Sequence, residues 1–212
     1  RITRSRFFEG VMRSVARLTY RDVGEFLEKP AAKHSPKLEH LRERLLALHG
    51  VYKSFIRARS GRGALELDTP ELKLKFDEQG KVAALVEYPR NDAHRLIEEC
   101  MIAANVAAAR FLDRYKVPTL YRVHGLPELD RLETLRTFLR EFGLWLPPPD
   151  EVTPDHLRDL LQKIGDRPDA GLISTAVIRT MPQAVYQPGN IGHFGLALEH
   201  YAHFTSPIRR YP

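Results

Sequence analysis

Thirteen residues at the end of the sequence read His200-Tyr201-Ala202-His203-Phe204-Thr205-Ser206-Pro207-Ile208-Arg209-Arg210-Tyr211-Pro212. Within them, Ser206 followed by Pro207 is typical of a helix N-cap with proline at the first helical position, where its missing N–H costs nothing. The pair predicts that a helix begins here. Arg209 and Arg210 would lie in its first turn, where the helix dipole disfavours cations by about 0.3–1 kcal/mol. A phosphate offsets this cost, because free backbone N–H groups and guanidinium groups both suit its oxygens. The stretch therefore predicts a phosphate site.

Hydrophobic periodicity in the rest of the chain predicts a mixed α/β (α+β) fold. Runs with apolar residues at helical spacing alternate with short runs in which every second residue is apolar. We expect helices over 38–57, 92–116, 128–142, 154–164 and 169–180, strands over 64–68, 72–76, 82–88 and 120–123, a turn at 77–80, and an extended segment over 7–20.

The helix expected over 92–116 has apolar residues on both sides, so we expect it to be largely buried. Glu98 and Asn105 lie on one seam of this helix, two turns apart. Two interpretations stay open for this pair. Either neighbouring loops satisfy both polar groups, or the groups serve a function, since a buried polar side chain requires a partner in both cases.

The composition is that of a folded, basic domain. The 212 residues are 43% hydrophobic and 28% charged, and the formal net charge is +6. Positive charge favours a polyanionic partner such as nucleic acid. A single cysteine excludes an internal disulfide and a cysteine-rich zinc site, and it fits a cytoplasmic protein. We expect neither a membrane span nor a signal peptide, because no apolar run approaches about 18 residues.

Three histidines near the end of the sequence suggest a metal triad, but no carboxylate or thiolate accompanies them at a regular spacing. They are His193, His200 and His203. The aspartates that could hold a divalent cation are scattered singly, at Asp68, Asp77, Asp113 and Asp130. We therefore expect no metal ligand in this chain.

Several motifs, in order along the chain, carry a family resemblance. They are Val11-Met12-Arg13-Ser14, Ala16-Arg17-Leu18-Thr19-Tyr20, Arg90-Asn91-Asp92-Ala93-His94, Leu96 to Asn105, Asp166 to Ala170, and Gly192-His193-Phe194-Gly195-Leu196-Ala197 leading into the final stretch. With these motifs the chain resembles the RNB exoribonucleases, the ribonuclease II and ribonuclease R family, and within it the bacterial ribonuclease R branch.

The resemblance implies that residues 1–212 are part of an RNB catalytic domain. In such a domain antiparallel strands form a core that is surrounded by helices and encloses a central RNA channel. The sequence begins at Arg1 and stops at Pro212, so we expect a piece of a longer protein. The aspartates that bind metal in the family are expected before residue 1, and domains of the cold-shock and S1 type are absent from this stretch.

The resemblance also assigns residues to the RNA site. Arg209 resembles the family's catalytic arginine, which contacts the phosphate at the scissile bond and stabilises charge during hydrolysis. Arg210 is a second RNA-contacting candidate, or it is structural. His203 and Thr205, with Tyr186, are expected to line the channel or to form local hydrogen bonds.

Two further candidates concern the ribose. Glu98 resembles the carboxylate that helps the family choose ribose over deoxyribose, and accepting a hydrogen bond from a 2′-OH is natural chemistry for it. Tyr20 resembles its partner, with a core aromatic as the alternative. Where relatives place a base-stacking phenylalanine, this chain has Leu67, so stacking there should be weaker or use another aromatic.

These residues predict the function of the parent protein. We expect a processive, Mg²⁺-dependent 3′-to-5′ exoribonuclease, monomeric and cytoplasmic, that hydrolyses single-stranded RNA to 5′-mononucleotides. Structured RNA with a 3′ overhang is a further candidate substrate. We expect the isolated chain to be inactive, because its Mg²⁺ ligands would lie elsewhere. The alternatives are a non-catalytic single-stranded RNA-binding module that keeps the channel and a scaffold with neither property.

Overall fold

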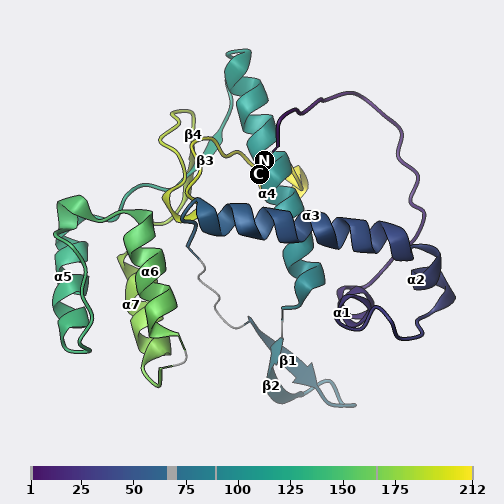
Figure 1. Cartoon of the computed structure of the whole chain (residues 1–212), viewed down its shortest axis with the longest axis horizontal. Coiled ribbons are helices and arrows are strands. Elements are labelled where there is room, and N and C mark those ends of the chain that lie inside the picture. Colours follow the sequence, from purple (N-terminus) through teal and green to yellow (C-terminus); the bar gives the residue numbers. More distant parts are fainter. Residues whose placement is uncertain (1, 66–70, 89, 166, 212) are drawn as a thin grey trace. The chain divides into compact units, whose positions relative to one another are not determined.

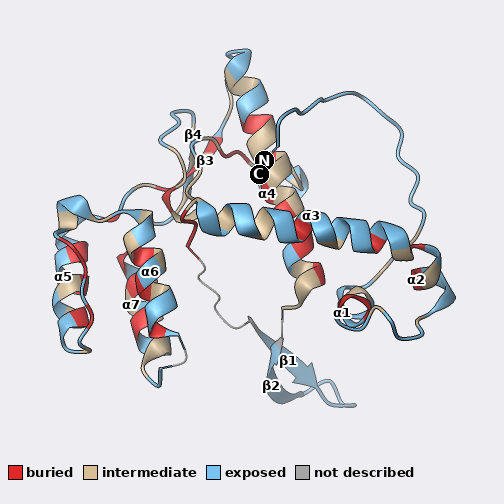
Figure 2. Cartoon of the chain, in the orientation of Figure 1, coloured by how far each residue is buried: buried red, intermediate tan, exposed pale blue. Residues whose placement is uncertain are grey.

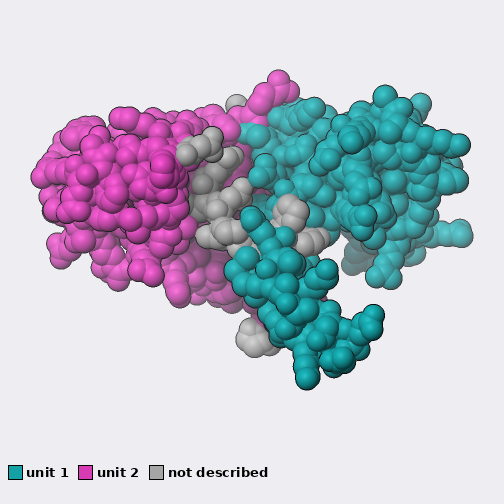
Figure 3. Space-filling model, turned by 90° about the horizontal axis from the view of Figure 1, so that it is seen from below, with its two compact units in different colours: residues 1–56, 68–100 teal, residues 57–67, 101–212 magenta. Residues whose placement is uncertain are grey.

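The structure, a computed structural model, describes residues 2–65, 71–88, 90–165 and 167–211. It divides into two compact units (Figure 3). Unit 1 comprises residues 1–56 and 68–100, and unit 2 comprises residues 57–67 and 101–212. Helices and strands both occur, and both strand pairs are antiparallel, so the predicted mixed class is confirmed (Figure 1).

Unit 1 begins with residues in no regular structure and then with α1 (Tyr20–Glu28). Thr19 caps this helix, because its side chain accepts from the Asp22 N–H at 3.1 Å. The helix predicted over 38–57 is α2 (Pro36–His40) followed by α3 (Arg42–Gly61), with Leu41 between them. The three helices bury a common apolar cluster of Phe26, Leu27, Leu38, Leu41 and Leu45 (Figure 2).

The predicted hairpin is present in unit 1 as β1 (Glu71–Phe76) and β2 (Val82–Tyr88). Its turn forms where expected, because the Asp77 carboxylate accepts from the N–H groups of Gln79 at 2.9 Å and Lys81 at 2.8 Å. The strand predicted over 64–68 lies partly outside the described residues, as does Leu67. Ala64 and Leu65 are described, and they are buried outside any strand.

The buried helix predicted from Asp92 is α4 (Asp92–Arg114), two residues shorter than expected. Asn91 caps the start of this helix, because its side-chain oxygen accepts from the N–H groups of Ala93 at 3.1 Å and His94 at 3.3 Å. The helix contributes residues to both units, and the division falls after Cys100. Its first part therefore carries Glu98 in unit 1, and its remainder carries Asn105 in unit 2.

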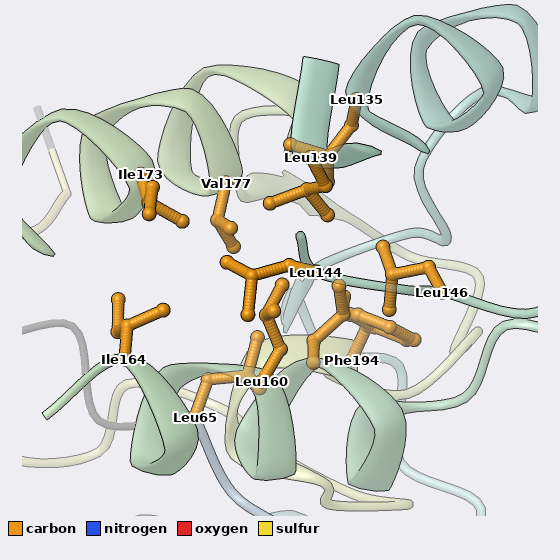
Figure 4. Close-up of a cluster of buried hydrophobic side chains, with 11 residues drawn as sticks. Leu65, Leu135, Leu139, Leu144, Leu146, Leu160, Ile164, Ile173, Val177 and Phe194 are labelled. Atoms are coloured by element: carbon orange, nitrogen blue, oxygen red, sulfur yellow. The ribbon is translucent and has the colours of Figure 1, made fainter. Parts of the chain in front are cut away.

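Unit 2 contains α5 (Leu129–Arg140), α6 (Pro154–Ile164) and α7 (Ala170–Thr180), close to their predicted bounds. The start of α6 follows from Pro154 at its first position and from His156, whose Nδ1 accepts from the Thr153 N–H at 3.1 Å. Side chains from the three helices point toward one another and toward Leu144 and Phe194 (Figure 4). Among the described residues, helices and connecting segments build this core, and the enclosing RNA channel stays a prediction.

A short antiparallel strand pair joins two distant segments of unit 2. The strand predicted over 120–123 is β3 (Tyr121–Val123), and its partner β4 (Val185–Gln187) was not predicted. Tyr121 and Val123 pack with Ala109 and Ala202, and the Arg122 N–H donates to the Tyr201 carbonyl at 2.9 Å. The segment is therefore anchored in unit 2 at Tyr201 and Ala202, which are both buried.

Candidate nucleic-acid interface

Asn105 holds the C-terminal segment of unit 2. Its Oδ1 accepts from the backbone N–H of Phe204 at 2.9 Å, the N–H of Thr205 at 3.0 Å and the hydroxyl of Thr205 at 3.2 Å. Its Nδ2 donates to the Tyr201 hydroxyl at 3.3 Å. Asn105 is only 3% exposed, so these bonds satisfy a buried amide. Of the two interpretations of Asn105, the structure supports satisfaction by a neighbouring segment.

The helix predicted at Pro207 is a single 3-10 turn, η3 (Pro207–Arg209). The prediction that Ser206 caps it by its side chain is wrong, because Ser206 has left-handed backbone angles (φ 56°, ψ 51°) instead of the extended ones of an N-cap. The Ser206 hydroxyl instead accepts from Arg209 Nη2 at 3.2 Å. A turn this short has little macrodipole, so the dipole argument for a phosphate fails. The argument that remains is the guanidinium chemistry of the arginines.

Arg209 and Arg210 are both exposed at the end of this turn, beside Ile208, which is 95% exposed. Thr205 and His203 are half-buried in the segment that leads to them. The Tyr211 hydroxyl returns to the His203 carbonyl at 2.9 Å and so closes the segment into a loop. The loop is held by hydrogen bonds at both ends, so binding of a phosphate would order little more than the two arginine side chains. Their guanidinium groups suit phosphate oxygens.

His203 belongs to a cluster of rings. Its Nδ1 is hydrogen-bonded to the Tyr186 hydroxyl, and the Arg122 guanidinium lies 4.7 Å from the centre of the Tyr186 ring. Burial, with the positive charges of Arg210 and Arg122, lowers the pKa of His203 to about 4. His203 is therefore neutral at pH 7, and it is available as a hydrogen-bond partner rather than as a cation. The local hydrogen bonding predicted for Tyr186 and His203 is present.

The glycine-rich motif before this segment has a packing role. The Gly195 N–H donates to His124 Nδ1 at 2.9 Å, and a Cβ on Gly195 would lie 3.1 Å from that same nitrogen. Phe194 is buried in the helical core of unit 2. The pKa of His193 is lowered to about 4, mainly by burial and in addition by the electrostatic effect of the neighbouring His124. Sequence motif and fold thus agree here, because only glycine allows the backbone to approach His124 so closely.

Unit 1 contains the ribose candidates. Tyr20 is 44% exposed and stacks on His94, with 4.1 Å between ring centroids and 20° between ring planes. Its carbonyl accepts from Asn91 Nδ2 at 2.9 Å. Glu98 lies one turn after His94 on α4 and forms an ion pair with Arg90. Tyr20 is therefore not a core aromatic, and the ring on which it stacks shares a helix face with Glu98.

The predicted residues fall into two groups. Tyr20 and Glu98 belong to unit 1, and His203, Thr205, Arg209 and Arg210 belong to unit 2. His94, Asn91 and Asn105 were not among the predicted site residues, although each lies within a motif or on a polar seam of the sequence. Only their positions in the sequence could have pointed to them. Asn91 and His94 follow Arg90 where a helix was predicted to begin, and Asn105 lies on the buried side of that helix.

The described residues do not supply a divalent metal site. Within residues 2–65, 71–88, 90–165 and 167–211, no three His, Cys, Asp or Glu side chains come together as a metal would require. His193 Nδ1 faces the Leu196 N–H at 3.3 Å, and His200 Nε2 lies 3.5 Å from Asp113. A Mg²⁺ ion does not fit these residues. In the same described part of the chain, every helix is too short or too polar to cross a bilayer.

Comparison with known proteins decides the family. The family model described as the RNB domain matches residues 1–212, the full chain. The chain belongs to the RNB family. This agrees with the resemblance carried by the sequence motifs, and it places the braced arginine segment of unit 2 inside an RNB domain.

Ribonuclease R proteins are among the relatives of this RNB chain. That of Escherichia coli (strain K12) is 44% identical over 215 residues, covering 100% of the chain and 26% of that protein. That of Vibrio cholerae serotype O1 is 48% identical over 208 residues, covering 97% and 25%. The chain therefore spans about a quarter of the length of these relatives.

Solved structures show the same RNB fold. Mycoplasma genitalium RNase R in complex with ribose methylated single-stranded RNA matches with a TM-score of 0.82 at 27% identity, over 91% of this chain and 30% of that one. The same protein in complex with double-stranded RNA matches with a TM-score of 0.80 at 26% identity, over 91% and 34%.

Proposed function

We propose that the protein containing this chain is a processive 3′-to-5′ exoribonuclease that hydrolyses single-stranded RNA to 5′-mononucleotides. The observation that carries the proposal is the RNB match over the full chain. Two further findings support it: the relatives are named ribonuclease R, and the braced segment of unit 2 exposes two arginines.

In this proposal Arg209 is the catalytic residue of the chain. Its guanidinium would contact the phosphate at the scissile bond and stabilise the charge that builds on the phosphate oxygens. Arg210, His203 and Thr205 would bind the same strand of RNA. His203 would do so as a neutral donor, since burial and Arg210 lower its pKa to about 4.

The ribose would be recognised in unit 1. Glu98 carries a carboxylate at a half-buried position, where it can accept from a 2′-OH, and Tyr20 presents an exposed ring held on His94. Arg90 pairs with Glu98, so it holds that carboxylate in one orientation for this role.

The remaining features of the proposal concern the whole protein. Structures of the Mycoplasma genitalium relative in complex with single-stranded and with double-stranded RNA support an RNA partner, and our proposed substrates are single-stranded RNA and structured RNA with a 3′ overhang. We place the protein in the cytoplasm as a monomer. Residues other than the described ones would bind Mg²⁺, because the described residues do not form a site for it. The isolated chain should therefore be inactive.

The test uses the full-length protein with single-stranded RNA labelled throughout its length, with and without Mg²⁺. We expect 5′-mononucleotides and no ladder of intermediates, because a processive enzyme finishes one strand before starting another. Arg209→Ala should lower kcat by about 10²–10³-fold and weaken RNA binding less, since the contact strengthens mainly in the transition state.

Arg140→Ala is the matched control, because Arg140 is an exposed arginine of unit 2 on α5, and its turnover should equal that of the wild type. RNA binding without any release of nucleotides by the wild-type protein would instead identify a non-catalytic RNA-binding protein. Normal turnover of Arg209→Ala would remove Arg209 from the site.

A further inference from the structure

Asn105 of α4 has a hydrogen-bonding pattern that exceeds what packing requires. A single side-chain oxygen accepts three donors from two consecutive residues, Phe204 and Thr205. Backbone N–H groups can only donate, so the atom that faces them must be an acceptor. A leucine of similar size would fill the same space and leave these donors unpaired in a buried position.

We propose that Asn105 is a positioning residue for the phosphate-contacting arginine: it fixes the segment from Tyr201 to Thr205 so that Arg209 is presented in one orientation. The inference rests on the proposed function of Arg209. Asn105 itself is buried and acts only through the segment that it binds.

The chain between the two residues is short and constrained. Thr205 lies four residues before Arg209, and Ser206 between them has a positive φ of 56°, which costs a residue other than glycine about 1 kcal/mol or more. A strained residue persists only when its neighbours are held. The three hydrogen bonds to the Asn105 oxygen fix the residues before Ser206. After Ser206, the hydrogen bond from Arg209 Nη2 to the Ser206 hydroxyl links Arg209 to the fixed segment.

The far end of the segment is held by the same side chain. Asn105 Nδ2 donates to the hydroxyl of Tyr201, which is 8% exposed, and the Tyr201 carbonyl accepts from the Arg122 N–H at 2.9 Å. One amide therefore spans residues 201 to 205. Asparagine has both an acceptor and an N–H donor, so it satisfies both ends of the segment without a buried charge.

The experiment measures amide exchange and kinetics on the full-length protein. In Asn105→Leu, the Thr205 N–H should exchange faster with deuterium, because its acceptor is lost. The Phe204 N–H is a weaker probe, since it also lies 3.1 Å from the Ala202 carbonyl. We expect kcat on short RNA to fall about 10–100-fold and KM to change less than about 3-fold, since a misplaced arginine weakens transition-state contact most.

Asn105→Asp is the rescue variant. A carboxylate keeps the acceptor for all three donors, and the Tyr201 hydroxyl can donate to it. We expect slow exchange of the Thr205 N–H and at least about a third of wild-type kcat, because the charge-assisted bonds offset part of the cost of burying the carboxylate. Val177→Ala in α7 controls for lost stability, because it opens a cavity in the helical core of unit 2 and should leave kcat unchanged.

The double variant Asn105→Leu with Arg209→Ala separates positioning from general structure. If Asn105 acts through Arg209, its loss should lower kcat by less than about 3-fold once Arg209 is absent. A full further loss in that background overturns the proposal, and so does unchanged exchange of the Thr205 N–H. The wild-type protein could release no nucleotides while Asn105→Leu still speeds exchange of the Thr205 N–H. That result would refute the proposed nuclease function and would retain the role of Asn105 in fixing the segment.

Discussion

At the scale of single residues, Tyr20 is defined by its neighbour His94. The two rings lie 4.1 Å apart, and the carbonyl of Tyr20 is bound by the Asn91 side chain, so the ring has one orientation although nearly half of it is exposed. A ring fixed in this way can lie against a sugar without losing much rotational freedom on binding. That property fits the role in ribose recognition proposed for Tyr20.

Removing either ribose candidate should relax sugar choice in the full-length protein. For Tyr20→Ala and Glu98→Ala we expect the ratio of RNA to DNA degradation rates to fall about 10-fold, because the 2′-OH loses a partner or a packing surface. The measurement compares RNA and DNA oligonucleotides of the same sequence. Tyr20→Phe is the control that keeps the ring on His94 and removes only the hydroxyl. Ratios equal to the wild type in both test variants would mean that the ribose is recognised elsewhere.

Neutral histidines should make stability depend on pH. The pKa values of His193 and His203 are about 4 in the fold, below the ordinary value of 6.5. Between pH 6.5 and 4 the unfolded chain binds more protons than the folded one, so stability falls as pH falls across this window and levels off below it.

We expect the thermal midpoint of the chain to drop by several degrees from pH 6.5 to pH 4, and the drop to be smaller in His203→Gln. A His203→Gln chain that loses as much stability as the wild type would show that His203 is already protonated in the fold at these pH values.

At the scale of secondary-structure elements, the start of α4 and the middle of α1 depend on each other. The Asn91 side chain caps α4 and also donates to the Tyr20 carbonyl at the start of α1. It lies directly against Gly24 of α1, where a Cβ would come 2.1 Å from Asn91 Nδ2 and 2.6 Å from Asn91 Cγ. A glycine inside a helix is normally unfavourable, and here the close approach of Asn91 requires it.

Two glycine substitutions should therefore have opposite signs. Gly50 of α3 is exposed and has no atom within 4 Å of the added Cβ, so Gly50→Ala should stabilise the fold by about 0.5–1 kcal/mol. Gly24→Ala should destabilise it by about 1–3 kcal/mol, because the methyl group displaces Asn91 and removes a helix cap. Urea unfolding of the two variants measures both values. A stabilised Gly24→Ala would show that Asn91 moves aside without cost.

At the scale of the whole molecule, each unit has its own apolar cluster, built by α1 to α3 in unit 1 and by α5 to α7 in unit 2. The hairpin of β1 and β2 differs, because its apolar residues are exposed, including Leu72 at 58% and Leu85 at 59% (Figure 2). Exposed strands with apolar side chains are prone to pairing with other chains. The first measurement on the isolated chain is therefore a circular dichroism melt.

A folded preparation of the 212 residues should bind RNA and leave it intact. With a net charge of +6 and no metal site among the described residues, we expect weak binding of single-stranded RNA and no nucleotide release with or without Mg²⁺. The logarithm of the affinity should fall with the logarithm of salt concentration with a slope of about −2 to −4, as for a few phosphate contacts. Mg²⁺-stimulated release of mononucleotides would place a metal site within this chain.

The sequence alone determined the family and most of the elements. The motifs from Val11 to Arg210 identified the RNB family, and helical periodicity located α4 and α6 to within two residues. The hairpin followed from alternation and from Asp77 in its turn. These features depend on residues close together in the chain, where backbone propensity and capping act.

Only the tertiary structure decided how the candidate residues are held. The partners of Asn105 lie 96 to 100 residues further along the chain, and those of Tyr20 lie about seventy residues away, so no local pattern specifies them. The left-handed Ser206 contradicted its local pattern of an N-cap, because the segment before it is bound to Asn105 and the turn after it is only three residues long. Such contacts arise from packing of distant segments, which buries a polar group only where the fold brings its partner to it.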